Sequence, residues 1–144
     1  MGARDGDRIV LHATTVAFGP DAVVICGPSG SGKSALGLRL MALGAALVAD
    51  DRTLIVRRGE GLVASAPPGL PALIEARGIG LLNAALAPGA RVALIADLGA
   101  VETGRLPPRH SRSLLGIAVE AVHGPETGHF PAAIMQYIKA GRQA

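Results

Sequence analysis

One stretch of the sequence carries residue types that bind phosphate. Residues 27–34 read Gly-Pro-Ser-Gly-Ser-Gly-Lys-Ser and fit the phosphate-binding loop pattern G-x-x-x-x-G-K-[ST]. Glycines in such a loop let successive backbone N–H groups turn toward a phosphate. Lys33 is expected to reach the outer phosphates of a nucleotide, and the Ser34 hydroxyl is expected to bind Mg²⁺. The predicted nucleotide-binding residues are Gly27, Pro28, Ser29, Gly30, Ser31, Gly32, Lys33 and Ser34.

The residues around this loop have the required order. Residues 22–26 are an apolar run typical of a buried strand, and residues 35–43 indicate a helix that ends at Gly44. A helix that begins at the loop adds free N–H groups and a favourable dipole for an anion. The alternative is a glycine-rich turn that matches the pattern by chance, but the flanking strand and helix favour the phosphate site.

An acidic pair follows the next apolar strand. Residues 45–49 predict that strand, and it ends on Asp50 and Asp51. In a strand–helix–strand unit the carboxyl end of the second strand lies beside the phosphate loop. One carboxylate could orient Mg²⁺ through water, while the other could accept a proton from a hydroxyl nucleophile. The alternative is a solvated turn at the end of the strand.

Three further side chains could serve the same site. His12 lies in an apolar segment and could equally be a core or edge histidine. Glu75 is an acid in a mostly apolar stretch and by itself is a weak candidate for a metal ligand. Arg105 lies in a polar segment and could clamp a phosphate or be solvated. The remaining histidines show no metal-ligand spacing: His110, His123 and His129.

The composition indicates one soluble domain. The chain has 144 residues, of which 49% are hydrophobic and 2% aromatic, so Ala, Leu, Val and Ile must form the core. The single Cys26 excludes an internal disulfide and is expected to be a small core residue. A formal charge of +3 with few aromatic side chains and no dense basic run argues against nucleic-acid binding.

No segment predicts membrane insertion. No apolar run approaches the roughly 18–20 residues that span a bilayer, and the polar residues 1–7 lack a signal-peptide core. We therefore expect a cytoplasmic protein that does not bind membranes, with a flexible segment at residues 1–7.

Strands are expected to outnumber helices. Residues 99–112 suggest a long mobile loop, and residues 72–78 a short turn or helical piece. The predicted class is α/β, with the phosphate loop in a strand-rich mixed sheet instead of a plain doubly wound sheet. Further strands are predicted at 8–18 (pairing with 22–26), 52–57, 62–66, 79–83, 91–98 and 113–122, and a terminal helix at 131–140.

Together these segments resemble a known family. His12, the phosphate loop, Leu47–Asp51 and Leu73–Gly80 are similar, in order and spacing, to the catalytic domain of HPr kinase/phosphorylase. The resemblance covers about residues 8–119, and the short form without an N-terminal domain resembles the alphaproteobacterial type. The V-A-D-D strand end and the E-x-R-G-[IL]-G segment are its specific features.

The resemblance implies a role for each candidate side chain. Asp51 would be the base that deprotonates the target serine, and the acid in the reverse phosphorolysis, with Asp50 assisting. His12 would be the active-site histidine near that aspartate. Glu75 would be the second Mg²⁺ ligand beside that of the phosphate loop, and Arg105 would be the arginine of the active-site loop.

The family also implies a fold, cofactors and partners. It implies a core akin to phosphoenolpyruvate carboxykinase, Mg²⁺, ATP as donor, an HPr-type phosphocarrier protein as substrate and assembly into hexamers. Residues 123–129 depart from the family because they lack the arginine of a segment tied to dephosphorylation. The phosphorylase reaction, the choice between ATP and pyrophosphate, and the regulatory ligands therefore stay open.

Two other functions fit the phosphate loop. One is a small-molecule kinase of the shikimate or gluconate type, although such chains usually have more helix and an arginine-rich lid. The other is a regulator that senses a nucleotide without efficient transfer.

Overall fold

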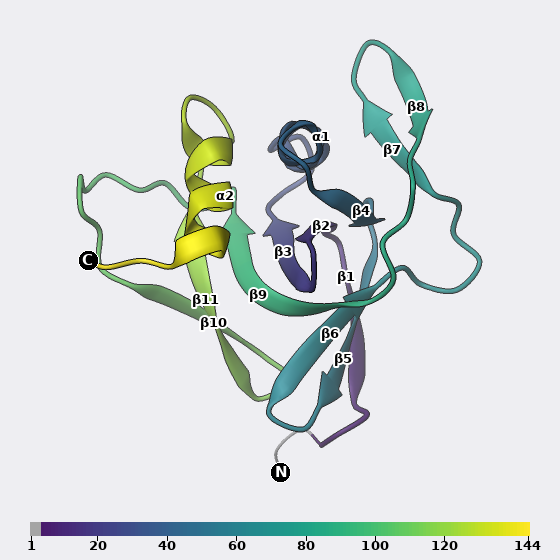
Figure 1. Ribbon diagram of the computed structural model, residues 1–144, viewed down its shortest axis with the longest axis horizontal. Helices are drawn as coiled ribbons and strands as arrows, with labels where there is room; N and C mark the ends of the chain where they lie inside the picture. The colour runs from purple at the N-terminus through teal and green to yellow at the C-terminus, as the bar shows by residue number, and fades with distance from the viewer. Residues whose placement is uncertain (1–3) are drawn as a thin grey trace.

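A curled sheet of nine strands forms the centre of the protein in the computed structural model, which describes residues 4–144 (Figure 1). A separate hairpin contains β7 (Leu73–Ala76) and β8 (Gly80–Asn83), and the helices are α1 (Lys33–Ala42) and α2 (Phe130–Ala140). The strands of the main sheet are β1 (Arg8–Leu11), β2 (Thr14–Phe18), β3 (Asp21–Cys26), β4 (Ala46–Ala49), β5 (Thr53–Arg58), β6 (Gly61–Ser65), β9 (Ala90–Asp97), β10 (His110–Leu114) and β11 (Ile117–His123).

The sheet is mixed, as predicted. Its main order is β1-β5-β6-β9-β3-β2-β4, and β9 pairs in parallel with both β3 and β11. The other strand pairs are antiparallel. Because β3 and β4 both run antiparallel to β2, they are parallel to each other. The carboxyl ends of β3, β4, β9 and β11 therefore lie at one edge of the sheet.

Strand β9 is the point at which the sheet divides. Its first residues pair with β6, while Ile95–Asp97 pair with the end of β11. A shift in the β3–β9 register adds Ala93 to β9, so Val92 and Leu94, which are two residues apart, face opposite layers. One layer contains Val24 and Ile95, and the other contains Ile25 and Leu94.

The two helices cover the second layer of the core (Figure 1). Leu36 and Leu40 of α1 and Ile134 of α2 are buried in it. Gly37 lets α1 approach β2 closely, because a Cβ at this position would lie 2.9 Å from the Thr14 methyl group. The helix after the phosphate loop is thereby pressed against the sheet.

Several predicted elements are confirmed. The strand at 22–26, the helices at 35–43 and 131–140 and the strand at 91–98 match β3, α1, α2 and β9 within a few residues. The first hairpin is also confirmed, since β2 pairs with β3. Cys26 is buried, as expected of a core residue.

The prediction of one continuous strand at 8–18 is wrong. It divides into β1 and β2 at His12 and Ala13, where the Ala13 N–H donates to the Asp51 carbonyl at 3.1 Å. The two halves then have different partners: β1 pairs with β5, and β2 pairs with β3 and β4. The break places His12 outside regular structure.

Two other segments form hairpins that the sequence did not predict. Residues 73–83 form the β7–β8 hairpin where a turn or helical piece was expected before one strand. The predicted strand at 113–122 is a hairpin of β10 and β11, with Leu115 and Gly116 at positive φ in its turn. The irregular segment predicted at 99–112 therefore ends at Arg109.

The start of the chain is only partly described. Residues 1–3 of the segment predicted to be flexible lie outside the described residues. Residues 4–7 lie along β5, where the Gly6 N–H donates to the Arg57 carbonyl at 2.7 Å. Across residues 4–144, neither helix is long and apolar enough to cross a bilayer.

The packing of α1 gives a prediction for stability. Leu40 is 0% exposed in the core, whereas Leu43 at the end of the same helix is 41% exposed. We expect Leu40→Ala to lower the free energy of unfolding by about 2–5 kcal/mol, because it leaves a cavity. Leu43→Ala, the matched control, should cost less than about 1 kcal/mol. Urea denaturation measures both, and equal effects would contradict this packing.

Candidate functional site

The phosphate loop has the backbone shape that its glycines were expected to provide. Gly27, Gly30 and Gly32 have φ values of 148°, 81° and 98°, a region that side chains with a Cβ rarely enter. A Cβ at Gly27 would lie 2.6 Å from the Ser31 hydroxyl oxygen. The Lys33 ammonium donates to the Gly27 carbonyl at 2.8 Å and so spans the loop.

The N-terminus of α1 has no side-chain cap in the described part of the chain, although a carboxylate lies close to it. Gly32 caps the helix in a left-handed conformation, and no side chain accepts a hydrogen bond from the first turn. The Ser31 hydroxyl oxygen is buried without a hydrogen-bond partner. Glu126 lies against Gly32, and its charge is offset by the Arg39 guanidinium at 3.3 Å. The Glu126 oxygen in this ion pair accepts no hydrogen bond.

Asp50 is the centre of the site. One carboxylate oxygen accepts hydrogen bonds from the Ser34 and Thr14 hydroxyls, both at 2.7 Å. The other oxygen accepts from the Glu75 backbone N–H at 3.0 Å. A single half-buried carboxylate at the end of β4 thus joins the phosphate loop, β2 and the β7–β8 hairpin.

Asp51 lies next to it in an unusual backbone conformation. Its φ is 68°, one of two non-glycine residues with positive φ in the described chain, and its side chain is exposed. The Ala13 N–H bonds to its carbonyl oxygen, so the segment that holds His12 runs alongside Asp51. His12 is also exposed. Two neighbouring carboxylates therefore have different surroundings: one is held by hydrogen bonds and one is open to solvent.

The other predicted side chains lie at different places. Glu75 is exposed on β7, and its backbone contact with Asp50 places it beside Ser34. Arg105 is exposed and lines a cavity of about 540 Å³ together with Glu102 and His110. The structure therefore joins Asp50 to the loop residue Ser34, brings the Glu75 backbone to the same carboxylate, and places Arg105 in a separate cavity.

Sequence reasoning missed an acidic residue at this edge. Asp97 ends β9 beside Cys26, the residue that precedes the phosphate loop, and it accepts a hydrogen bond from the Gly99 N–H at 2.8 Å. The signal was present, because an apolar strand ends on an aspartate here as it does at Asp50.

Burial raises the pKa of the Cys26 thiol, although the positive charges of Arg112 and Lys33 act to lower it. A neutral buried thiol is chemically inert.

Two of the histidines lie together although their spacing in the sequence does not indicate it. His110 and His123, which show no metal-ligand spacing in the sequence, lie together with Glu102, with their candidate ligand atoms within 4.8 Å of one another. The residues of this cluster come from neighbouring strands and a loop, so no local sequence pattern predicts it.

The residues around the phosphate loop fit a nucleotide with Mg²⁺. Mg²⁺ prefers oxygen ligands; the Ser34 hydroxyl and the Asp50 carboxylate are in contact, and the Glu75 backbone N–H binds the same carboxylate, which brings a third oxygen-bearing residue to this region. The unpartnered Ser31 hydroxyl and the uncapped helix end offer donors for phosphate oxygens.

Known proteins resemble this chain in sequence. Residues 6–96 match the model of the HPr Serine kinase C-terminal domain. HPr kinase/phosphorylase of Limosilactobacillus reuteri is 35% identical over 143 residues, which cover 90% of this chain and 45% of the relative. HPr kinase/phosphorylase of Cupriavidus necator is 43% identical over 77 residues, which cover 53% of this chain and 24% of the relative. The chain thus spans less than half the length of these relatives.

A solved structure has the same fold. The Hpr(Ser) kinase/phosphatase from Coxiella burnetii superposes with a TM-score of 0.75 over 91% of this chain and 94% of that chain, at 24% identity. The family match covers most of the chain, including the phosphate loop, the acidic pair and Glu75. The chain therefore belongs to the HPr Serine kinase C-terminal domain family.

Proposed function

We propose that this chain is the catalytic domain of an ATP-dependent protein-serine kinase that acts on an HPr-type phosphocarrier protein. The observation that carries the proposal is the Asp50 carboxylate, which joins the phosphate-loop Ser34 to the Glu75 segment within a chain of this family. Phosphoryl transfer needs mainly positioning and charge neutralisation. The protein is expected to act in the cytoplasm, and the hexamer implied by the family remains a proposal.

The phosphate loop would hold the donor. Its backbone N–H groups and the start of α1 would face the phosphates, and Lys33 would exchange its bond to the Gly27 carbonyl for the outer phosphate oxygens. Bound Mg²⁺ would neutralise developing charge on the β- and γ-phosphate oxygens. Ser34 and Glu75 would be its protein ligands, with Asp50 fixing both positions.

Asp51 would act on the acceptor serine. Its exposed carboxylate can take the hydroxyl proton as the serine oxygen forms a bond to the γ-phosphorus and the bond to the ADP oxygen breaks. The segment that holds His12 runs beside Asp51, and His12 would tune the basicity of the Asp51 carboxylate. In the reverse direction, an oxygen of inorganic phosphate would attack the phosphorus of phosphoserine, the bond to the serine oxygen would break, and Asp51 would return the proton to that oxygen as pyrophosphate forms. Arg105 would reach the phosphoryl group from the adjoining cavity.

The base assignment predicts a selective loss in rate. Asp51→Asn keeps a side chain that tolerates the left-handed backbone but removes the base, so we expect transfer to fall about 10²–10⁴-fold with little change in nucleotide affinity. Glu60→Gln removes an equal charge from a side chain that is 97% exposed and should transfer normally. The assay is transfer from radiolabelled ATP to purified HPr-type protein, with wild-type rates for Asp51→Asn contradicting the assignment.

The same assay separates the alternatives. Lys33→Ala should abolish transfer, since it removes the cation expected at the outer phosphates. A wild-type chain that binds Mg-ATP tightly but labels no protein would be a nucleotide-sensing regulator. Labelling of a sugar or a small acid in its place would identify a small-molecule kinase. Release of pyrophosphate from phosphorylated substrate on addition of inorganic phosphate would establish the reverse reaction.

The role of Asp50 predicts a loss in binding. In Asp50→Asn an amide nitrogen replaces one of the two carboxylate oxygens. If this nitrogen faces Glu75, it meets another N–H donor. If it faces the Ser34 and Thr14 hydroxyls, a hydroxyl loses its acceptor. Hydrogen bonds to a charged group contribute about 1.5–3 kcal/mol, so Mg-ATP affinity should fall about 10–150-fold by calorimetry. Glu75→Gln keeps the backbone N–H that binds Asp50 but removes a proposed metal ligand. We therefore expect it to weaken only the binding of Mg²⁺. Unchanged affinity in Asp50→Asn would contradict this role.

A further inference from the structure

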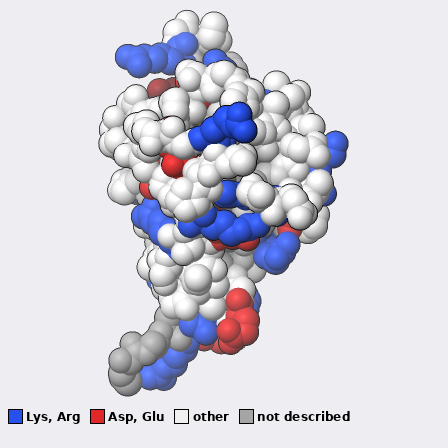
Figure 2. Space-filling view, turned by 90° about the vertical axis from the view of Figure 1, so that its left-hand side faces the viewer, with Lys and Arg blue, Asp and Glu red and all other residues white. Residues whose placement is uncertain are grey.

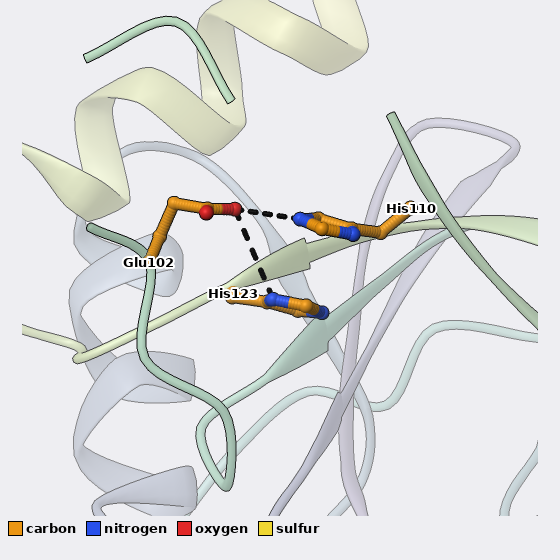
Figure 3. A group of neighbouring side chains, drawn as sticks. All are labelled: Glu102, His110 and His123. Carbon is orange, nitrogen blue, oxygen red and sulfur yellow. Dashed lines mark hydrogen bonds and ion pairs between the residues drawn. The ribbon is translucent and has the colours of Figure 1, made fainter. Parts of the chain in front are cut away.

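The cavity beside the phosphate loop contains a group of side chains that the proposed function does not use. Glu102, His110 and His123 meet at its wall (Figure 3). A Glu102 carboxylate oxygen lies 2.7 Å from His110 Nε2 and 3.8 Å from His123 Nδ1. The imidazole rings are stacked, with centroids 3.9 Å apart and planes 15° apart. All three side chains are half-buried.

The strand register creates this group. His110 is paired with Ala121 across the β10–β11 hairpin, and His123 lies two residues farther along β11 on the same face. Diagonal neighbours of this kind lie within reach of each other. Glu102 comes from the irregular segment between β9 and β10, and its carboxylate points toward both imidazole rings (Figure 3).

The donor set matches a transition metal better than Mg²⁺. Two imidazole nitrogens and one carboxylate oxygen are the ligands of many zinc sites, which keep a fourth position open. Tetrahedral Zn²⁺ with bonds of about 2.0–2.1 Å places its ligand atoms about 3.3–3.4 Å apart. The separations of 2.7 and 3.8 Å lie on either side of this value, but the stacked rings lie in nearly parallel planes, so one imidazole would have to turn until both ring planes contain the ion.

The surroundings define the open position. It would face the cavity of about 540 Å³, which Arg105 and Arg142 also line. Figure 2 shows basic side chains on the face of the molecule that includes this region. These cations favour an anion, such as hydroxide, as the fourth ligand.

We propose that Glu102, His110 and His123 bind Zn²⁺ and that the ion fixes the segment carrying Arg105. Glu102 is the ligand from that segment, so binding would tie residues 99–109 to β10 and β11. The zinc site does not rest on the proposed kinase activity, and its test needs neither ATP nor a protein substrate.

The test is titration of the metal-free full chain with Zn²⁺ against a chromophoric chelator. We expect one equivalent per chain, bound at least about tenfold more weakly in His110→Ala and His123→Ala. His129→Ala is the matched control, because His129 lines the same cavity but lies outside the cluster. Asp50→Asn should also bind normally, which separates this site from the phosphate loop.

Two further measurements test the site independently of the titration, in case a variant folds poorly. Co²⁺ should give a visible absorption spectrum typical of nitrogen and oxygen ligands in the wild type, and His110→Gln with His123→Gln should lose it. Zn²⁺ should also slow trypsin cleavage after the exposed Arg105 in the wild type but not in His123→Ala. Equal Zn²⁺ affinity in the wild type and in folded His123→Ala would overturn the proposal. So would a loss seen only in Asp50→Asn, or trypsin cleavage that Zn²⁺ does not change.

Discussion

The arrangement of the site depends on the Asp50 carboxylate and the three donors around it. Ser34 begins the helix after the phosphate loop, Thr14 belongs to β2, and the Glu75 N–H belongs to a hairpin outside the main sheet. The Asp50 carboxylate thus forms a polar link between the hairpin and the phosphate loop. The same carboxylate that could orient a metal thus also positions the segment that supplies another candidate ligand.

Topology explains why chemistry gathers where it does. The parallel strands β3, β9 and β11 lie side by side, and β4 runs in the same direction one strand farther along. Their carboxyl ends bring the phosphate loop, Asp97, His123 and Asp50 to one edge of the sheet. Ligands bind at this edge in open sheets of parallel strands. Two separate clusters, one rich in oxygen and one in nitrogen, can therefore adjoin without sharing a side chain.

The oxygen-rich cluster around Asp50 could be predicted from the sequence, because it follows from a local motif and the order of the elements that flank it. A glycine loop between a strand and a helix, followed by a strand that ends on acids, fixes the positions of Ser34 and Asp50 through topology alone. The β10–β11 hairpin could not be predicted in this way, because its turn uses Leu115 at a φ of 49° inside an apolar run that reads as one strand. The stacking of His110 on His123 depends on that register. Likewise, β7 depends on tertiary contacts, since Ile74 packs into the helix-covered layer.

The backbone at Asp51 connects fold and function. A left-handed conformation at a non-glycine residue costs about 1–3 kcal/mol and persists only where the surroundings hold it. Here the Ala13 N–H holds the Asp51 carbonyl, and the Arg52 N–H donates to the Asp50 carbonyl at 2.7 Å. Glycine would remove the strain but also the carboxylate, whereas aspartate tolerates it better than most side chains. The turn thus directs one acid inward onto Ser34 and leaves the next exposed, as the proposed metal-orienting group and the proposed base would require.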